Sequence, residues 1–188
     1  MESVNNDLVF GASGRIGDML VFRQRGGKTF ISKRPKKQEV SDSEDQVAVK
    51  ERFKEGVLYA KAVVADPVRK AVYQAKSHAL LSAYNLALAD YYKAPEIKSI
   101  NTEGYTGRSG DEIAIRAIDD FKVDKVHVTI KGSDNVEIEN GLAVVGPNGI
   151  DWLYMSTEDN PTPSGSKVIV KASDLPGNVT AAEYLITL

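Results

Sequence analysis

The sequence of 188 residues contains no cysteine and only two histidines. The absence of cysteine excludes disulfide bonds, thiolate nucleophiles and cysteine-based zinc or iron–sulfur sites. A bound metal ion would therefore need oxygen ligands or the side chains of His78 and His127.

The chain also lacks long apolar stretches and the pattern of an export signal. No apolar run approaches the roughly 20 residues that a membrane-spanning helix requires. The first residues, MESVNNDLVFGASGR, have no cationic start, no apolar core and no small-residue cleavage pattern. We therefore expect a protein that is cytoplasmic on synthesis and has no membrane partner, with incorporation into a virion or another particle as its further destination.

Charge is unevenly distributed, although the net charge is only −2. Residues 15–37 carry eight bases and one acid, whereas residues 96–188 carry fifteen acids and eight bases. A segment of one sign attracts the opposite charge, on a polyanion or on another copy of the protein. The basic segment is therefore the part of the chain that we expect to bind a partner.

The basic segment has the pattern of a β-hairpin. In residues 18–34, DMLVFRQRGGKTFISKR, β-favouring residues flank Gly26 and Gly27. Two adjacent glycines suit a tight turn with positive φ angles. Alternation places Phe22 and Arg23 on opposite faces. Because an isolated hairpin is marginal in water, we expect this one to pack against the helices or against another subunit.

A helical segment is predicted to follow, over residues 42–95. Ser43 and Gln46 have the spacing of a capping box, and Asp66-Pro67 is a second helix start, since proline suits the first helical position. The expected apolar stripe of the first helix is Phe53, Val57, Ala60 and Val64, and a last helical run extends from Leu80 to Tyr92.

Beyond Ala94 the hydrophobic period changes from helical to alternating, which together with frequent turn residues is typical of an antiparallel sandwich. The expected strands are Glu96–Asn101, Glu112–Ile118, Lys125–Lys131, Val136–Glu139, Leu142–Val145, Ile150–Tyr154, Lys167–Ser173 and Ala182–Thr187. The expected inward residues are Ile113, Ile115, Ala117, Val126, Val128, Ile130, Trp152, Tyr154, Val168, Val170 and Ala172.

Three stretches of this segment, GDEIAIRAIDDFKVDKVHVTI, WLYMS and KVIVKASDLPGNVT, resemble the bacterial immunoglobulin-like domain. The resemblance covers residues 96–188 and implies an immunoglobulin-like β-sandwich, without the disulfide of antibody domains. It implies no particular role, because one fold hosts many functions. The predicted fold class is therefore α+β: a basic β-hairpin arm (1–41), a helical segment (42–95) and an immunoglobulin-like antiparallel β-sandwich (96–188).

A glycine motif precedes the hairpin. Gly11, Gly14 and Gly17 follow a short apolar run and resemble the phosphate loop of atypical short-chain dehydrogenases. That loop requires a helix directly after the third glycine and then a parallel strand with a ribose-binding acid. Because a hairpin is predicted there instead, a nicotinamide-dependent enzyme is the least favoured function, and the glycines are expected to serve a turn.

The basic arm leaves two partners open. It could contact an acidic surface of a neighbouring subunit, or it could bind the phosphates of nucleic acid, as minor-groove β-arms do. Charged residues on an edge strand also prevent unwanted strand addition. The candidate binding residues are Arg23, Arg25, Lys28, Lys33, Arg34, Lys36 and Lys37.

Acidic and amide side chains are expected to meet at one end of the sandwich, where loops converge. Several hard oxygen ligands are what calcium prefers, but Asp and Asn are also ordinary turn formers. No cofactor is expected, with a calcium ion as the alternative for this region, and the candidate calcium ligands are Asp119, Asp120, Asp174 and Asn178.

Taken together, these features predict a non-enzymatic structural or assembly protein, a subunit of a virion or injection-type particle. Its arm would add strands to a neighbouring copy or clamp against it, which makes a homo-oligomer or other subunits of an assembly the expected partners. A nucleic-acid-binding protein that uses the same arm is the alternative.

Overall fold

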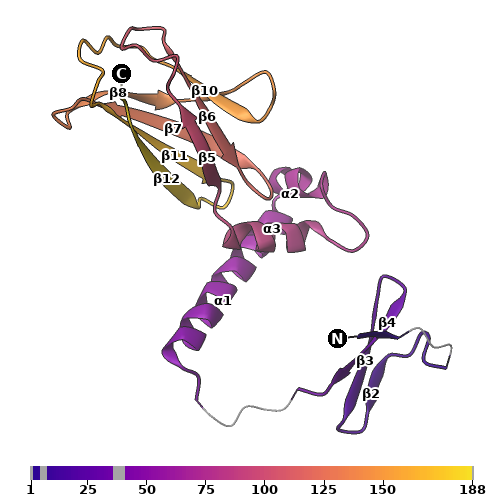
Figure 1. Ribbon diagram of the computed structural model, residues 1–188. Coiled ribbons are helices and arrows are strands. Elements are labelled where there is room, and N and C mark those ends of the chain that lie inside the picture. Colours follow the sequence, from indigo (N-terminus) through magenta and orange to yellow (C-terminus); the bar gives the residue numbers. More distant parts are fainter. Residues whose placement is uncertain (1, 5–7, 36–40, 188) are drawn as a thin grey trace. The chain divides into compact units, whose positions relative to one another are not determined.

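The computed structural model describes residues 2–4, 8–35 and 41–187, with side chains from residue 8 onward. In these ranges the chain forms three helices and three four-stranded antiparallel sheets, an α+β arrangement (Figure 1). The contacts divide the chain into two compact units, Met1–Leu86 and Ala87–Leu188.

The first unit begins with a four-stranded sheet in the order β1-β4-β3-β2. Our prediction of a hairpin is confirmed, but the prediction of only two strands is wrong, since a short strand is added at each edge. Strands of three residues are too short to show the alternation by which a sequence reveals a strand. The four strands are β1 (Glu2–Val4), β2 (Gly14–Ile16), β3 (Leu20–Arg25) and β4 (Lys28–Lys33).

The turn of the hairpin has the predicted glycine geometry. Arg25 pairs with Lys28 across Gly26 and Gly27, whose φ angles are 57° and 73°. Two consecutive positive φ angles define a type I′ turn, which side chains other than glycine, asparagine and aspartate rarely adopt. The glycine pair therefore fixes the register of the hairpin.

Three helices follow the sheet, each started by the side chain that precedes it. The capping box is confirmed: the Gln46 amide donates to Ser43 Oγ at 3.3 Å, and the Ser43 amide donates to Gln46 Oε1 at 3.1 Å. Asp66 caps the second helix by accepting from the Val68 amide at 2.8 Å. The helices are α1 (Glu44–Ala65), α2 (Pro67–Gln74) and α3 (Ala83–Tyr92).

Helix α3 begins at Ala83 rather than at the predicted Leu80. The Asn85 amide donates to Ser82 Oγ at 3.3 Å, so Ser82 starts the helix. An isolated bridge between His78 and Leu81 holds the preceding residues in a turn. None of the helices in the described ranges has both the length and the apolar character that crossing a bilayer requires.

The predicted stripe of α1 is only partly correct. The buried residues of α1 are Gly56, Ala60 and Val63, whereas Phe53 is 53% exposed. Helix α2 packs beside this second half of α1, where the hydroxyls of Tyr59 and Tyr73 lie 2.8 Å apart. The stripe was misplaced because a sequence shows which side of a helix is apolar but not how much of that side has a neighbour.

The second unit contains the other two sheets, in the orders β5-β6-β10-β9 and β12-β11-β7-β8. Every predicted strand region is represented, and the first two strands have the predicted bounds. The strands are β5 (Glu96–Asn101), β6 (Glu112–Ile118), β7 (Val123–Lys131), β8 (Glu137–Leu142), β9 (Val144–Val145), β10 (Asp151–Met155), β11 (Lys167–Asp174) and β12 (Val179–Leu185).

The two sheets of the second unit enclose one hydrophobic core. The predicted inward residues of β6, β7 and β11 are buried, as is Tyr154 on β10, and Trp152 is partly buried against them. The chain passes from one sheet to the other at Ala143, between β8 and β9, where the Ala143 amide donates to the Val126 carbonyl at 2.9 Å. The alternation of side chains along each strand therefore builds this core, as the sequence predicts.

Candidate functional site

Strand register assigns the side chains of the N-terminal sheet to two faces. Residues directly opposite in antiparallel strands point to the same face. Arg23 is opposite Phe30, and Arg25 is opposite Lys28. We call the surface that these residues share the cationic face, and its described residues are Arg15, Val21, Arg23, Arg25, Lys28, Phe30 and Ser32.

The four bases of the cationic face are all exposed, and none of its described side chains is acidic. Val21 and Phe30 are partly exposed beside them. Arg15 was counted in the basic segment but not among the candidate binding residues, because nothing in the sequence indicated that β2 would pair with β3. The pairing of Arg15 with Val21 supplies that missing signal.

The opposite face of the same sheet is covered by residues 8–13, which precede β2. The Gly11 amide donates to Thr29 Oγ1 at 3.1 Å. Gln24 Nε2 donates to the Ala12 carbonyl at 2.9 Å and to Thr29 Oγ1 at 2.7 Å. Thr29 and Phe22 are buried as a result. The sheet thus has one covered face and one open face, and most of its bases are on the open one.

The remaining candidate residues of the arm are placed differently. Lys33 is opposite Leu20 and so belongs to the covered face, although it is exposed. Arg34 forms an ion pair with Asp18. Lys36 and Lys37 lie outside the described residues. Of the seven candidates, the structure gathers Arg23, Arg25 and Lys28 on one face.

The glycine motif does not have the geometry of a dinucleotide loop. The φ angles of Gly11, Gly14 and Gly17 are 78°, 109° and 53°, so each glycine permits a bend. No helix follows Gly17: the chain turns, and Leu20 pairs antiparallel with Ile16. The strand–helix crossover whose N-terminus would hold a pyrophosphate is therefore missing here, which argues against the nicotinamide alternative.

A second cluster, in the C-terminal unit, is acidic. One carboxylate oxygen from each of Asp90, Asp119 and Asp174 lies within 4.8 Å of the others. Asp90 and Asp174 are buried, and Asp119 is partly buried. Asp90 was not among the predicted ligands because it lies on α3, far along the chain from Asp119 and from Asp174 at the end of β11. These three carboxylates are the residues of this region that could hold a cation.

The other two calcium candidates have different partners. Asp120 is exposed and forms an ion pair with Lys93. Asn178 turns its amide nitrogen, not its oxygen, to this region: Nδ2 donates to Asp174 Oδ2 at 2.7 Å and to the carbonyls of Asp90, Tyr91 and Lys93 at 3.3 to 3.4 Å. The predicted set of four ligands is thus not assembled.

Asp174 and Asn178 have a clear structural role. Asp174 Oδ1 accepts from the amides of Gly177 at 2.9 Å and Asn178 at 2.6 Å, which closes the turn between β11 and β12. The side chain of Asn178 donates to carbonyls at and just beyond the C-terminal end of α3, where the last carbonyls of a helix lack their usual amide partners. The Asp-x-x-Gly-Asn pattern therefore ties α3 to the turn.

Asp119 is the carboxylate of the cluster that lies beside a cleft. It lines a cleft of about 330 Å³ together with Lys93, Ala94, Glu96, Ile118 and Asp120. Its Oδ1 accepts from the Phe121 amide at 2.8 Å, whereas its buried Oδ2 has no hydrogen-bond partner in the described part of the chain. Burial raises the pKa of Asp119, and the nearby charges of Asp174 and Asp120 raise it further.

Replacing Asp119 with asparagine is expected to raise the free energy of unfolding at pH 7, by on the order of 0.5 kcal/mol for a partly exposed group. Because the folded-state pKa of Asp119 is raised, the contribution of this carboxyl to the free energy of unfolding is fully present below the ordinary Asp value of 3.8. That contribution is lost as the pH rises through the folded-state pKa. The advantage of the variant should therefore vanish near pH 3.5. Urea unfolding in chelator-treated buffer, followed by Trp152 fluorescence, measures the difference in stability between variant and wild type at both pH values.

The matched control is Asp120→Asn, which removes the exposed, ion-paired neighbour of Asp119 and should not stabilise the protein at pH 7. A stabilisation by Asp119→Asn that is equal at both pH values, or a destabilisation at pH 7, would contradict the argument from charge.

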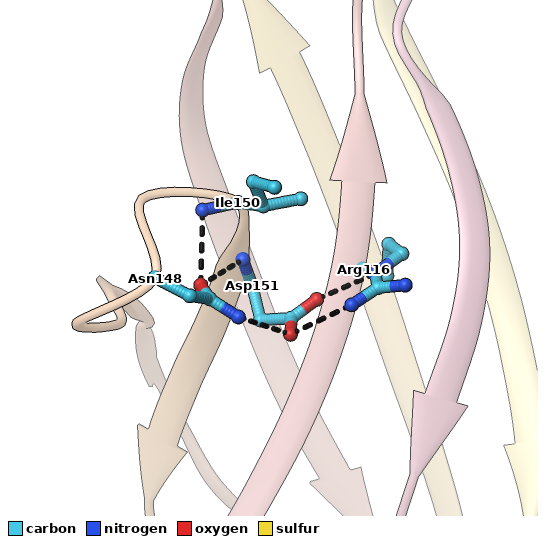
Figure 2. A network of polar contacts seen from close by, with 4 residues as sticks. All are labelled: Arg116, Asn148, Ile150 and Asp151. Atoms are coloured by element: carbon cyan, nitrogen blue, oxygen red, sulfur yellow. Dashed lines mark hydrogen bonds and ion pairs between the residues drawn. The ribbon is translucent and has the colours of Figure 1, made fainter.

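A polar network on the outer side of the second unit fixes the turn between β9 and β10 (Figure 2). Asp151 accepts from Arg116 Nε at 2.7 Å and from its terminal nitrogen at 3.0 Å, and from Asn148 Nδ2 at 2.7 Å. Asn148 Oδ1 accepts from the amides of Ile150 and Asp151 at 3.0 and 2.9 Å. The hydrogen bonds from Arg116 and Asn148 lower the pKa of Asp151.

This network has a structural explanation. All four residues labelled in Figure 2 take part in its hydrogen bonds. The turn that Asn148 closes is an ordinary Asx turn. An exposed ion pair of this type contributes at most about 1 kcal/mol. The network therefore orders the edge of one sheet and is not a candidate for binding.

The cationic face is thus the surface whose geometry most resembles a binding site, and the acidic cluster is second. Comparison with known proteins adds no assignment: no protein-family model, no curated protein and no solved structure matches this chain.

Proposed function

We propose that this chain is a non-enzymatic structural subunit of an assembly, of the virion or injection-particle type, and that it docks through its N-terminal unit. The observation that carries the proposal is the exposure of the first half of α1. Every residue from 41 to 55 is exposed, so the first three turns of this helix leave most of their side-chain surface open to solvent. An isolated helical segment of only three turns is marginally stable in water without packing.

The exposed half of α1 is apolar along one line. Val49, Phe53, Gly56, Ala60 and Val63 follow one another at intervals of four, three, four and three residues. This is the spacing of a seam between two helices. The last three are buried within the unit, whereas Val49 and Phe53 are 70% and 53% exposed. The seam therefore continues past the helix that covers its second half, which favours a partner from outside the chain.

The N-terminal sheet adds a second surface of the same kind. Phe22 is its only buried large apolar side chain among the described residues, and Leu8, Phe10, Ile16 and Met19 are exposed. A sheet that buries so little apolar area is weakly stable by itself. Contact with a neighbouring subunit would cover these side chains and stabilise the sheet.

An immunoglobulin-like identity for the second unit is part of the proposal. With β5, β6 and β7 taken as strands A, B and C, the order β5-β6-β10-β9 corresponds to A-B-E-D, and β12-β11-β7-β8 corresponds to G-F-C-C′. These are the sheet orders of immunoglobulin domains. The correspondence supports the resemblance found in the sequence, and such a unit would present its loops outward from the assembly.

Sedimentation velocity over a wide concentration range tests the docking proposal. We expect self-association of the wild-type chain, and loss of that association in the double variant Val49→Ser/Phe53→Ser. Because both side chains are exposed, the variant should unfold within about 0.5 kcal/mol of the wild type. The matched control is Leu58→Ser, which removes an equally exposed side chain that lies off the seam.

The proposal is contradicted by a wild-type chain that stays monomeric at several hundred micromolar. It is also contradicted if Val49→Ser/Phe53→Ser unfolds at much lower urea as a monomer, because those side chains would then be covered within the chain itself.

A further inference from the structure

The cations of the cationic face form a continuous band. Register places Arg15, on β2, beside Val21 of β3. Arg23 and Arg25 follow Val21 on the same face of β3, and Lys28 lies on β4 beside Arg25. Alternate residues of a strand are about 7 Å apart, and neighbouring strands about 5 Å. The band therefore crosses three strands diagonally, with a cation at each step and no described acid within it.

Three of these four cations are arginines. A guanidinium presents a rigid fork of donors that matches a phosphate in two hydrogen bonds, and it is more weakly hydrated than an ammonium. No ion pair engages these four side chains within the described part of the chain. Their charges are therefore available to an outside anion.

An aromatic ring lies within the band. Phe30 is opposite Arg23 and is partly exposed on the same face. A flat sheet that presents an aromatic ring among bases can stack a nucleobase while its cations contact the phosphates on either side. A carboxylate-rich protein surface would use the cations but has no requirement for the ring.

The outer side of the second unit provides a contrast. By register, β7 and β11 bring Lys125, Lys131, Lys167 and Lys171 to one side of their sheet. Glu137 and Glu183 pair with the same rows, and Lys167 forms an ion pair with Glu183 at 2.9 Å. That side has the same number of bases, but acids lie between them, and a polyanion would be repelled at those points.

We propose that the cationic face of the N-terminal sheet binds single-stranded nucleic acid, with Arg15, Arg23, Arg25 and Lys28 on the phosphates and Phe30 stacked on a base. This goes beyond the assembly role, which requires no nucleic acid, and it rests on different residues.

Fluorescence anisotropy with a labelled oligothymidylate tests the proposal on the full chain. We expect micromolar or tighter binding at about 50 mM salt, and a logarithmic salt slope near −3, since each phosphate neutralised on a single strand contributes about −0.7. A labelled duplex of the same length should bind more weakly, because a flat sheet face cannot enter a groove.

Two sets of variants separate this site from general charge. Changing Arg15, Arg23, Arg25 and Lys28 to glutamine should abolish binding, whereas changing Lys125, Lys131, Lys167 and Lys171 to glutamine alters net charge equally and should leave affinity within about twofold. Arg15→Lys/Arg23→Lys/Arg25→Lys keeps the charge but removes the forked donors, so it should weaken binding less than the glutamine set and leave the salt slope unchanged. Phe30→Leu should weaken binding about tenfold with the salt slope unchanged.

Absence of binding at tens of micromolar protein in low salt overturns the proposal, and this result needs no variant to fold. Equal loss of affinity in both glutamine sets also overturns it. Binding of labelled polyglutamate but not of the oligonucleotide overturns it in favour of an acidic protein partner. Val49→Ser/Phe53→Ser should bind the oligonucleotide normally, so failure of the assembly role and failure of this proposal can be told apart.

Discussion

Replacing Asn178 with alanine is expected to lower the free energy of unfolding of the C-terminal unit by about 2 to 3 kcal/mol. The side chain donates to Asp174 and to three carbonyls at the end of α3, and the variant leaves these partly buried acceptors without it. Trp152, the single tryptophan of the chain, lies partly buried against the core and reports the unfolding. Urea titration followed by its fluorescence measures the change.

The isosteric variant Asn178→Asp should be more damaging at pH 7 than Asn178→Ala. It places a carboxylate 2.7 Å from Asp174 and at the negative end of the α3 dipole. Its excess cost should shrink as the pH is lowered and the introduced carboxylate gains a proton. If Asn178 were instead a calcium ligand, aspartate would strengthen the site, and millimolar calcium would rescue the variant.

The core of the second unit could be predicted because its information is local. Ile113, Ile115 and Ala117 alternate with exposed or partly exposed positions on β6, and each lies inward. Period-two alternation is a property of one strand and does not depend on which strands are neighbours. The inward residues of the core strands are therefore readable from the sequence, as are the bounds of β5 and β6.

The candidate sites depend on pairings that a sequence does not display. Arg15 joins the cationic face only because β2 pairs with β3. Asp90 meets Asp119 and Asp174 only because α3, the loop after β6 and the end of β11 converge. The predicted stripe of α1 failed at Phe53 for the same reason, since the extent of the neighbouring helix decides what is buried.

Glu139 shows how an irregularity defeats alternation. The predicted strand Val136–Glu139 ends on this acid, which a sequence pattern assigns to solvent, yet Glu139 is only 6% exposed. The register of β7 and β8 shifts between Ile130 and Lys131, which is a bulge. A bulge reverses which side chains face inward beyond it. Alternation counted from one end of β8 therefore gives the wrong face at Glu139.

Replacing Glu139 with alanine is expected to lower the free energy of unfolding by about 3 kcal/mol, because buried donors lose a charged acceptor. Oε2 of Glu139 accepts from the Tyr154 hydroxyl at 3.1 Å, the Thr157 amide at 2.7 Å and Thr157 Oγ1 at 2.8 Å. These bonds hold the segment after β10 to β8. Glu139→Gln keeps an acceptor and should lower the free energy of unfolding by only about 1 kcal/mol. Glu139→Leu fills the space without an acceptor, so it separates the effect of lost hydrogen bonds from the effect of a cavity.

The pH dependence of the same variants identifies the role of the charge. Burial raises the pKa of Tyr154 above its ordinary value of 10, and the charge of Glu139 raises it further. The folded state then keeps a proton that the unfolded state releases, so stability falls as pH rises above 10. Removing the Glu139 charge brings this folded-state pKa down, so the alkaline decline in stability of Glu139→Gln should level off at a lower pH than that of the wild type. Burial also raises the pKa of Tyr105, so part of the alkaline decline persists in the variant. An identical decline in both proteins would mean that Glu139 acts on Tyr154 through packing alone.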